Sequence, residues 1–569
     1  MSHGQTASFS PKAHGLQDFH AQGSDASGLK AHDSRLKTHN SKLTTQASSI
    51  FWTMSNRRSA VNFAFGNFDI QTGFAVSHQY DRSLGVVRPG KPLTLRATTV
   101  PEYLEVNAYI LEGLGPFTPH DIRDQGVAVP FYRSGSGWTA TLDGRPDGTI
   151  VNYIVEAVHR SGHLHYADGR LPHELARVFT HRVTSRRPPE WTNDAVVYQV
   201  FVDRFANAAG PVSMPDNDLT FAGGDLHGIT ANLDWLTNLG VNCLWLTPVF
   251  TCHSYHGYDA IDLKTIDPRF GGDEALADLV EAAHDRGIRV LLDLVPNHIS
   301  QRHPWFTSAQ ADGPERDWFF FNDDGSYLMF FGSVSMPKVN LDHPHARAAM
   351  LDVAAYWVKE FGIDGYRIDH ALGPSESFFA ALAEELEAIN PDVWLFGEVT
   401  ATPQLCRRYG GVLDGVTDFP FAYGMRELLA GNIDPRDFAE IEREAAAALD
   451  PADFSWVRFF DNHDMARAIH GWDNERAALA RAVDMLFSMP GVPSFFYGTE
   501  QALSHDRSEA EAGLNVGRVP MAFDRNDEMF MHVQQAIARW HASNTGPKTP
   551  MMWAPDATRW TWGDLSGSM

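Results

Sequence analysis

Acidic, histidine and arginine side chains occur at four places in the sequence where an apolar run ends. The four stretches are "DLVPNH" (293–298), "GYRIDH" (365–370), "GEV" (397–399) and "FFDNHD" (459–464). Together they supply candidate acids, bases and nucleophiles: Asp293, Asn297, His298, Arg367, Asp369, His370, Glu398, His463 and Asp464. A single aspartate after an apolar run is more often a cap or a turn residue. Convergence of all four stretches on one site would instead indicate catalysis.

Asp369 and Glu398 have surroundings that predict opposite protonation states. Residues two apart in a strand share a face, so Arg367 lies beside Asp369. We expect this cation to lower the pKa of Asp369 and keep it ionised, as a nucleophile requires. Apolar neighbours should hold the proton of Glu398, which suits a general acid. Two such carboxyl groups are what retaining glycoside cleavage uses, although Arg367 and Asp369 alone could also be an ordinary pair that ties down a strand end.

The elements that must position these residues alternate between apolar strands and amphipathic helices. Strand candidates occupy 195–205, 241–250, 288–298, 362–370, 393–400, 415–420, 454–464 and 490–500, and helical periodicity separates them, as in 273–287 and 474–488. Continuous apolar strands alternating with helices are typical of a parallel sheet covered on both faces, and eight repeats predict a (β/α)8 TIM barrel. An open, doubly wound sheet is the alternative, but no glycine-rich phosphate loop follows the first strand. Barrel enzymes build their sites at the C-terminal strand ends, where the four stretches lie.

The rest of the chain divides by composition. Residues 1–55 are polar and poor in apolar side chains, which predicts a disordered N-terminal segment. Short alternating stretches with Gly, Pro and Asp turns over 56–184 predict a β-sandwich. The barrel is expected over 185–543, beginning with a proline-containing linker, "SRRPPEW". A long aromatic connection, 299–342, is predicted to be an inserted subdomain that mostly packs its own core, with a few rings left for a sugar platform.

Charge and composition exclude several functions. The 569 residues carry 71 acidic and 46 basic side chains, a formal charge of -25, which disfavours a nucleic-acid partner or an anionic membrane surface. Three cysteines without metal-type spacing indicate neither a disulfide framework nor a zinc site. No apolar run is long enough for a membrane-spanning helix, and the first thirty residues lack a basic start followed by an apolar core. We therefore expect a cytoplasmic protein with a neutral ligand.

The four stretches, in this order, resemble the conserved regions of the α-amylase family, glycoside hydrolase family 13, over about residues 191–543. The resemblance implies that Asp369 is the nucleophile, Glu398 the acid/base and Asp464 the stabiliser of the transition state. It also implies that the substrate-binding residues include Tyr258, which stacks on the sugar ring, His298 and His463, which bond to the sugar, and Arg367, which orients the nucleophile. Asp293 and His370 join this predicted set by position.

Within the family, the sequence is similar to the neopullulanase, cyclomaltodextrinase and maltogenic amylase group, for example in "MPKVN" (336–340). The resemblance implies that 56–184 is a carbohydrate-binding module of the kind that can form a homodimer. Two segments depart from the group: "HALG" (370–373) follows the nucleophile and "TATP" (400–403) follows the acid/base region. Both line the leaving-group side, so substrate preference stays open. Residues 544–569 are too few for the family's C-terminal domain, and we expect a remnant of it.

Calcium is the one cofactor that the resemblance brings into question. Asn297 matches a calcium-ligand position of the family, and Asn207, Gly223 and Asp225 lie in a stretch similar to a calcium loop of the group. Oxygen ligands suit calcium. The spacing differs from the group's motif, however, and Asn/Asp-rich loops are often simple turns. No cofactor is predicted to be required.

These observations predict a retaining α-glucan hydrolase that cleaves α-1,4 bonds in maltooligosaccharides, cyclodextrins or starch-type glucans by double displacement. A glucan transglycosylase on the same scaffold is one alternative, because water and an acceptor sugar compete for the same intermediate. A non-catalytic glucan-binding homologue is the other. Such homologues typically lose catalytic carboxylates, whereas all three are present here.

Overall fold

The computed structural model describes residues 76–79, 85–168, 177–505 and 515–543, and the backbone of three short strands near the C-terminus. These strands, β22 Met552–Trp553, β23 Arg559–Trp562 and β24 Leu565–Ser568, pair antiparallel within the segment predicted to be a remnant domain. The predicted disorder of residues 1–55 lies outside the described residues.

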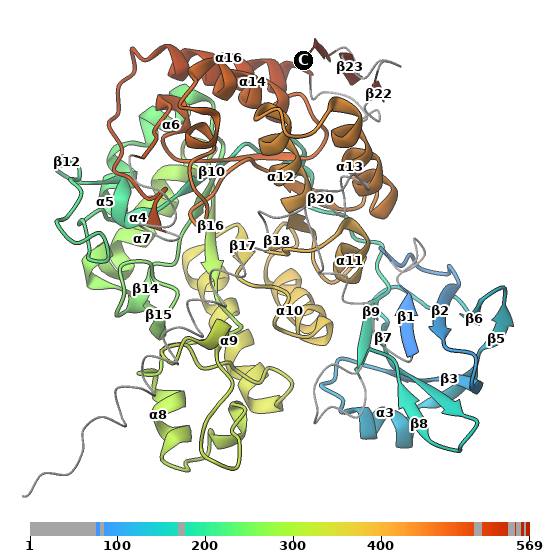
Figure 1. Cartoon of the computed structure of the whole chain (residues 1–569). Helices are drawn as coiled ribbons and strands as arrows, with labels where there is room; N and C mark the ends of the chain where they lie inside the picture. Colours follow the sequence, from blue (N-terminus) through green and yellow to red (C-terminus); the bar gives the residue numbers. More distant parts are fainter. Residues whose placement is uncertain are drawn as a thin grey trace, which may run out of the picture. The chain divides into compact units, whose positions relative to one another are not determined.

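The predicted TIM barrel is confirmed as a closed barrel of eight parallel strands (Figure 1). The strands follow in chain order: β10 Val197–Val200, β13 Cys243–Leu246, β16 Arg289–Leu294, β17 Gly365–Ile368, β18 Trp394–Gly397, β19 Gly415–Thr417, β20 Ser455–Arg458 and β21 Val492–Phe496. Each lies within one of the eight apolar runs. The barrel closes where β10 pairs with β21.

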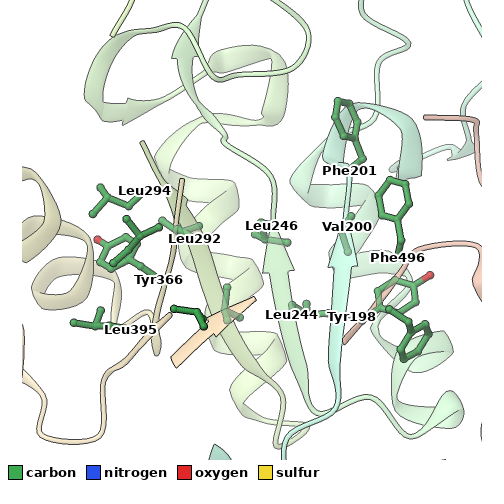
Figure 2. Close-up of a cluster of buried hydrophobic side chains, with 14 of the residues drawn as sticks. Tyr198, Val200, Phe201, Leu244, Leu246, Leu292, Leu294, Tyr366, Leu395 and Phe496 are labelled. Atoms are coloured by element: carbon green, nitrogen blue, oxygen red, sulfur yellow. The ribbon is translucent and has the colours of Figure 1, made fainter. Parts of the chain in front are cut away.

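Amphipathic helices cover the outside of this barrel because their apolar faces have no other surface to bury against. The longer ones are α7 Gly272–His284, α9 Pro344–Phe361, α10 Glu376–Ile389, α12 Phe419–Leu429, α13 Pro435–Ala448, α14 Arg476–Leu486 and α16 Glu528–Ser543. Outward-facing strand residues such as Leu244, Leu292 and Tyr366 form the core beneath them (Figure 2).

Inward-facing strand residues fill the barrel interior. Val197, Cys243, Leu291, Trp394 and Val457 pack there as a separate apolar cluster. Because side chains alternate along a strand, the next inward positions toward the C-terminal ends include polar residues, and two of them are charged, Asp293 of β16 and Arg367 of β17. These two residues are direct partners in the β16–β17 register. The apolar interior therefore ends in a buried charged layer.

Gly365 lets β17 and β18 approach closely at the start of this layer. Its φ is 155°, and a Cβ there would lie 2.0 Å from the backbone oxygen of Trp394. A larger residue would push the two strands apart. The glycine therefore fixes the spacing of the strands that lead to Asp369 and Glu398.

Two antiparallel sheets in residues 76–182 share one apolar core, as predicted for a β-sandwich. One sheet has the order β1-β2-β6-β5 and the other β4-β3-β7-β8, with β9 also paired to β7. The strands are β1 Val76–Gln79, β2 Leu93–Thr99, β3 Tyr103–Glu112, β4 Val127–Pro130, β5 Tyr132–Ser134, β6 Gly137–Leu142, β7 Ile150–His159, β8 Leu164–Tyr166 and β9 Phe179–Arg182.

The long connection after β16 contains α8 Pro304–Gln310 and the single turns η4 Arg316–Trp318 and η5 Phe330–Gly332. Phe306 packs edge-on against Phe319 and Tyr327, with ring centroids 4.9 and 4.7 Å away. Phe331 differs because 85% of its surface is exposed. Phe306 and Phe319 belong to the same apolar core as the barrel, so the prediction that the connection packs a core of its own was wrong, and Phe331 faces outward.

Candidate active site

Arg367 is the centre of the buried charged layer. Its Nη1 donates to Asp293 Oδ1 at 2.7 Å and to Asp369 Oδ1 at 2.8 Å. Its Nη2 lies 2.9 Å from Glu398 Oε2, and the guanidinium is fully buried. One cation therefore gathers carboxylates from the ends of three adjacent strands, β16, β17 and β18.

Backbone hydrogen bonds continue past the strand ends and fix these carboxylates. The amide of Asp369 donates to the Leu294 oxygen at 2.8 Å, and the amide of Glu398 donates to the Ile368 oxygen at 2.8 Å. The Ala371 amide donates in turn to the Glu398 oxygen at 3.0 Å. Both side chains therefore sit on rigid backbone at the strand ends.

Tyr258 connects this layer to the end of β20. Its hydroxyl donates to Asp293 Oδ2 at 2.8 Å and lies 2.6 Å from His463 Nε2. The rings of Tyr258 and His463 also stack, with centroids 5.3 Å apart and planes within 6°. Trp245 donates from Nε1 to the same Asp293 oxygen at 3.2 Å.

Asp464 follows His463 and is held on both sides. His463 Nε2 lies 3.1 Å from Asp464 Oδ2, and Arg518 Nη2 donates to Asp464 Oδ1 at 3.0 Å. Burial raises the pKa of Asp464, but His463, Arg518 and Arg367 outweigh it, so the pKa lies well below its ordinary value. Asp464 is therefore ionised.

The pKa of Asp369 differs in direction from the prediction. Burial raises its pKa well above the ordinary 3.8, and the carboxylates of Glu398, Asp293 and Asp464 raise it further. Arg367 acts in the predicted direction but does not outweigh them. The expectation of a lowered pKa was wrong, because it considered the neighbour in sequence and not the carboxylates that other strands bring to the site.

His298 and His370 meet at a phenylalanine of the long connection. His298 stacks on Phe330 with centroids 4.3 Å apart, and His370 lies edge-on to the same ring at 5.0 Å. Burial lowers the pKa of His298 to about 3 and also lowers that of His370, so both rings are neutral at pH 7. The His370 amide donates to Glu398 Oε2 at 3.0 Å, from a left-handed backbone with φ 41°.

The structure thus brings together the residues predicted from the four stretches, including Asn297, whose Nδ2 lies 3.2 Å from His298 Nδ1, and also the predicted Tyr258. Arg518, Trp245 and Gln199 were missed. Gln199 Nε2 lies 2.6 Å from His463 Nδ1. Gln199 and Trp245 occupy inward positions of β10 and β13, so strand alternation could have identified them. Arg518 lies in a connecting segment that carries no motif.

The four candidate calcium residues do not form a free set of oxygen ligands. Asn207 turns its Nδ2 to the Gly223 oxygen at 3.1 Å and accepts from the Ala209 amide at 2.9 Å. Asp225 caps helix α5, Leu226–Ala231, by accepting from the Gly228 amide at 2.7 Å. Asn297 comes from another strand end, where its buried Oδ1 faces Gly373 and has no hydrogen-bond partner within the described residues. Asn207, Gly223 and Asp225 therefore lie together, Asn297 lies at a separate position, and a role for calcium stays a prediction.

In the parts of the chain that the structure describes, no group of three or more His, Cys, Asp or Glu side chains could hold a metal ion. The same residues contain no helix that is long and apolar enough to cross a membrane.

Comparisons with known proteins agree with this geometry. The sequence model of the α-amylase catalytic domain matches residues 199–326 and 321–562. Alpha-amylase 2 of Dictyoglomus thermophilum is 34% identical over 365 residues, which are 63% of this chain and 64% of that protein. Intracellular maltogenic amylase of Bacillus subtilis is 31% identical over 388 residues, 64% of this chain and 65% of that protein. These matches span slightly less than two thirds of the length of either relative.

A solved structure is similar over more of the chain. A cyclomaltodextrinase superposes with a TM-score of 0.62 and 26% identity, covering 86% of this chain and 89% of its own. The likeness therefore extends beyond the barrel.

Proposed function

Because the chain belongs to the α-amylase family, we propose that it is a retaining α-glucan hydrolase that cleaves α-1,4-glucosidic bonds by double displacement. The observation that carries this proposal is the single guanidinium of Arg367, within 2.8 Å of Asp369 and 2.9 Å of Glu398. One guanidinium spans only a short distance. This favours the close pair of carboxyl groups used by retaining enzymes over the wider pair used by inverting ones.

In the first displacement, the carboxylate form of Asp369 attacks the anomeric carbon. Oδ1 of Asp369 is held by Arg367, which leaves Oδ2 to form the new bond to carbon. The bond to the leaving oxygen breaks, and Glu398 transfers its proton to that oxygen. The products of this step are a glucosyl ester on Asp369, a shortened glucan with a free hydroxyl, and a Glu398 carboxylate.

In the second displacement, Glu398 takes a proton from water, and the water oxygen attacks the same carbon. The ester bond to Asp369 breaks, so the nucleophile is restored as a carboxylate and Glu398 is protonated again. Two inversions give net retention. A sugar hydroxyl in place of water would give transglycosylation by the same residues. The acceptor molecule, water or sugar, therefore decides between hydrolysis and transglycosylation.

Asp464, His463, Tyr258 and His298 are assigned to the sugar that reacts. Asp464 keeps a third of its side chain exposed at the site, so it can accept from sugar hydroxyls. The neutral ring of His298 has a buried Nε2 without a hydrogen-bond partner in the described part of the chain, and a sugar hydroxyl would satisfy it.

Maltooligosaccharides and cyclodextrins are the proposed substrates. Support comes from relatives named maltogenic amylase and cyclomaltodextrinase. The test is chromatography of products after incubation with γ-cyclodextrin, pullulan, soluble starch and maltotriose, with Asp369→Asn protein as the control. Cleavage of cyclodextrin faster than starch is expected. Preference for starch would reject the cyclomaltodextrinase-like assignment, and an equal rate with Asp369→Asn would reject the hydrolase itself.

We also propose a homodimer through the β-sandwich and a cytoplasmic location. Val127 and Tyr132 on sandwich strands are 70% and 72% exposed, and apolar side chains of this kind favour association. One relative is named an intracellular enzyme. Sedimentation of the wild type and of Val127→Asp, Tyr132→Asp protein tests the dimer: a monomeric wild type would contradict it. Fractionation of the source cells tests the location.

A further inference from the structure

Arg518 lies outside the sequence motifs, yet it makes several hydrogen bonds to residues of the site. It lies between η8 Thr499–Gln501 and helix α16, and only 5% of its surface is exposed. Its Nε donates to the His463 oxygen at 2.8 Å, and its Nη1 donates to Tyr255 Oη and Asn515 Oδ1, both at 2.9 Å. Its Nη2 donates to Asp464 Oδ1. The guanidinium is therefore held in place by hydrogen bonds other than the one to Asp464.

The aromatic surroundings of Arg518 fix the plane of its guanidinium as well. Its central carbon lies 5.0 Å from the Phe201 ring and 5.8 Å from the Tyr255 ring. Such packing suits a planar guanidinium, whereas a lysine would place a single point charge there. The geometry at this position is specific to arginine.

Asp464 is held by Arg518 and by two neighbours in sequence. Arg518 and His463 each contact one of its carboxylate oxygens, and its amide donates to Asn462 Oδ1 at 2.9 Å. The side chain of Asp464 is 33% exposed, whereas that of Arg518 is 6% exposed. Asp464 is therefore the more accessible of the two groups to a sugar.

We propose that Arg518 is the positioning residue for Asp464: it sets the carboxylate in the orientation that binds the reacting sugar in the transition state. This inference rests on the proposed function, because it needs a reaction that Asp464 assists. Arg518 itself does not touch the reacting atoms. Its effect on rate should therefore pass through Asp464 alone.

A double-mutant cycle tests this dependence. Arg518→Met should lower kcat/KM for an aryl α-maltoside by about 10²-fold, the loss that a misplacement of about 1 Å produces. In an Asp464→Asn background the same change should cost less than about twofold, which is within the scatter of independent effects. An equal loss in both backgrounds would overturn the proposal. Turnover of the aryl substrate by the wild type tests the proposed function separately, and its absence would reject that function.

Arg426→Met is the matched control. Arg426 donates to the Phe460 and Ala466 oxygens of the same loop at 3.3 and 2.9 Å, without a contact to Asp464. Its loss should lower activity equally in both backgrounds, as a merely structural arginine would.

Two further variants keep the test decisive if Arg518→Met does not fold. Arg518→Lys keeps the charge but cannot hold both the His463 oxygen and Asp464 in one plane, so it should still lose activity only when Asp464 is present. Arg518→Ala should regain activity with added guanidinium at low, non-denaturing concentration and not with sodium chloride of equal ionic strength. Equal responses to both salts would contradict a positioning role.

Discussion

The floor of the candidate site and its rim are built in different ways. The floor is a connected network of charged and polar groups: Asp293, Arg367, Asp369, Glu398, Tyr258, His463 and Asp464. Asp293 and Arg367 lie in barrel strands, and the other groups lie in segments that follow strand ends. The rim, Phe330, Phe331 and His370, comes from connecting segments. Two of its three residues, Phe331 and His370, have a left-handed backbone, with φ of 43° and 41°.

This difference separates chemistry from selectivity. A change in the floor breaks a connected network of charges, so it should affect rate and stability together. A change in the rim removes a surface that only a bound ligand would cover. We therefore expect large effects at the floor that are independent of substrate, and small ones at the rim that depend on it.

The largest effects are expected for the two reacting carboxyl groups. Asp369→Asn should reduce hydrolysis of maltooligosaccharides by about 10⁴-fold or more, because the nucleophile is lost. Glu398→Gln should reduce it by about 10²–10⁴-fold, and less for an aryl glycoside whose leaving group needs no proton. Steady-state kinetics on both substrates measure this. Near-wild-type turnover by either variant would contradict the expectation that changes in the floor cause large losses of rate.

Arg367→Met should be the most destabilising change in the floor. Removal of the cation leaves Asp293 and Asp369 as buried carboxylates without their partner, which costs about 3–5 kcal/mol. Denaturant unfolding measures the cost. Arg443→Met on helix α13 is the control: its side chain is 68% exposed, and a change within about 0.5 kcal/mol is expected. Equal costs for both arginines would contradict the account.

The two aspartates Asp369 and Asp464 should affect stability with opposite signs. The folded-state pKa of Asp369 is raised, so its stabilising contribution is full below the unfolded pKa and is lost as pH rises through the folded value. Asp369→Asn should therefore raise Tm at pH 7, by roughly 2 °C or more if the gain is about 1 kcal/mol. The gain should disappear in acid, below the ordinary pKa.

The folded-state pKa of Asp464 is lowered instead. Its contribution is present above the unfolded pKa and is lost as pH falls through the folded value. Asp464→Asn should therefore lower Tm at pH 7. Melting curves from pH 7 down to acid measure the Tm shift of each variant relative to the wild type. Shifts of the same sign for both variants at pH 7 would contradict the electrostatic account of the floor.

The smallest effect is expected at the rim. Phe331→Ala should change the free energy of unfolding by less than about 0.5 kcal/mol, since the ring is exposed. Phe306→Ala in the same connection, where the ring is buried, should cost about 3–5 kcal/mol. Phe331→Ala should raise KM for cyclodextrin several-fold, as expected for one aromatic contact, and leave an aryl maltoside unaffected. Identical changes for both substrates would show that the rim does not select.

Sequence reasoning reached the barrel and the floor because both follow from local patterns. Apolar strands and helical periodicity repeat eight times, and the alternation of side chains predicts that Arg367 and Asp369 share a face. Tyr258, in contrast, was predicted only through the family resemblance. The raised pKa of Asp369 could not be reached in this way, because it depends first on burial inside the folded barrel and then on the carboxylates that other strands bring near, Glu398, Asp293 and Asp464.

The conformation of the rim and the role of Arg518 could not be predicted from the sequence, for a different reason. Nothing in "HALG" predicts that His370 takes a left-handed backbone and aims its amide at Glu398. Arg518 belongs to a segment without periodicity, and only the closed barrel brings it to Asp464. Residues of this kind are found through three-dimensional contacts and not through motifs.

The stereochemistry of the first product tests the central claim most directly. Proton NMR of a maltooligosaccharide digest, recorded in the first minutes before mutarotation, identifies the anomer that the enzyme releases. Double displacement through Asp369 predicts the α-anomer, which then equilibrates with the β-anomer. Initial release of the β-anomer would contradict the account, because it requires a single displacement by water and leaves Asp369 without its role as nucleophile.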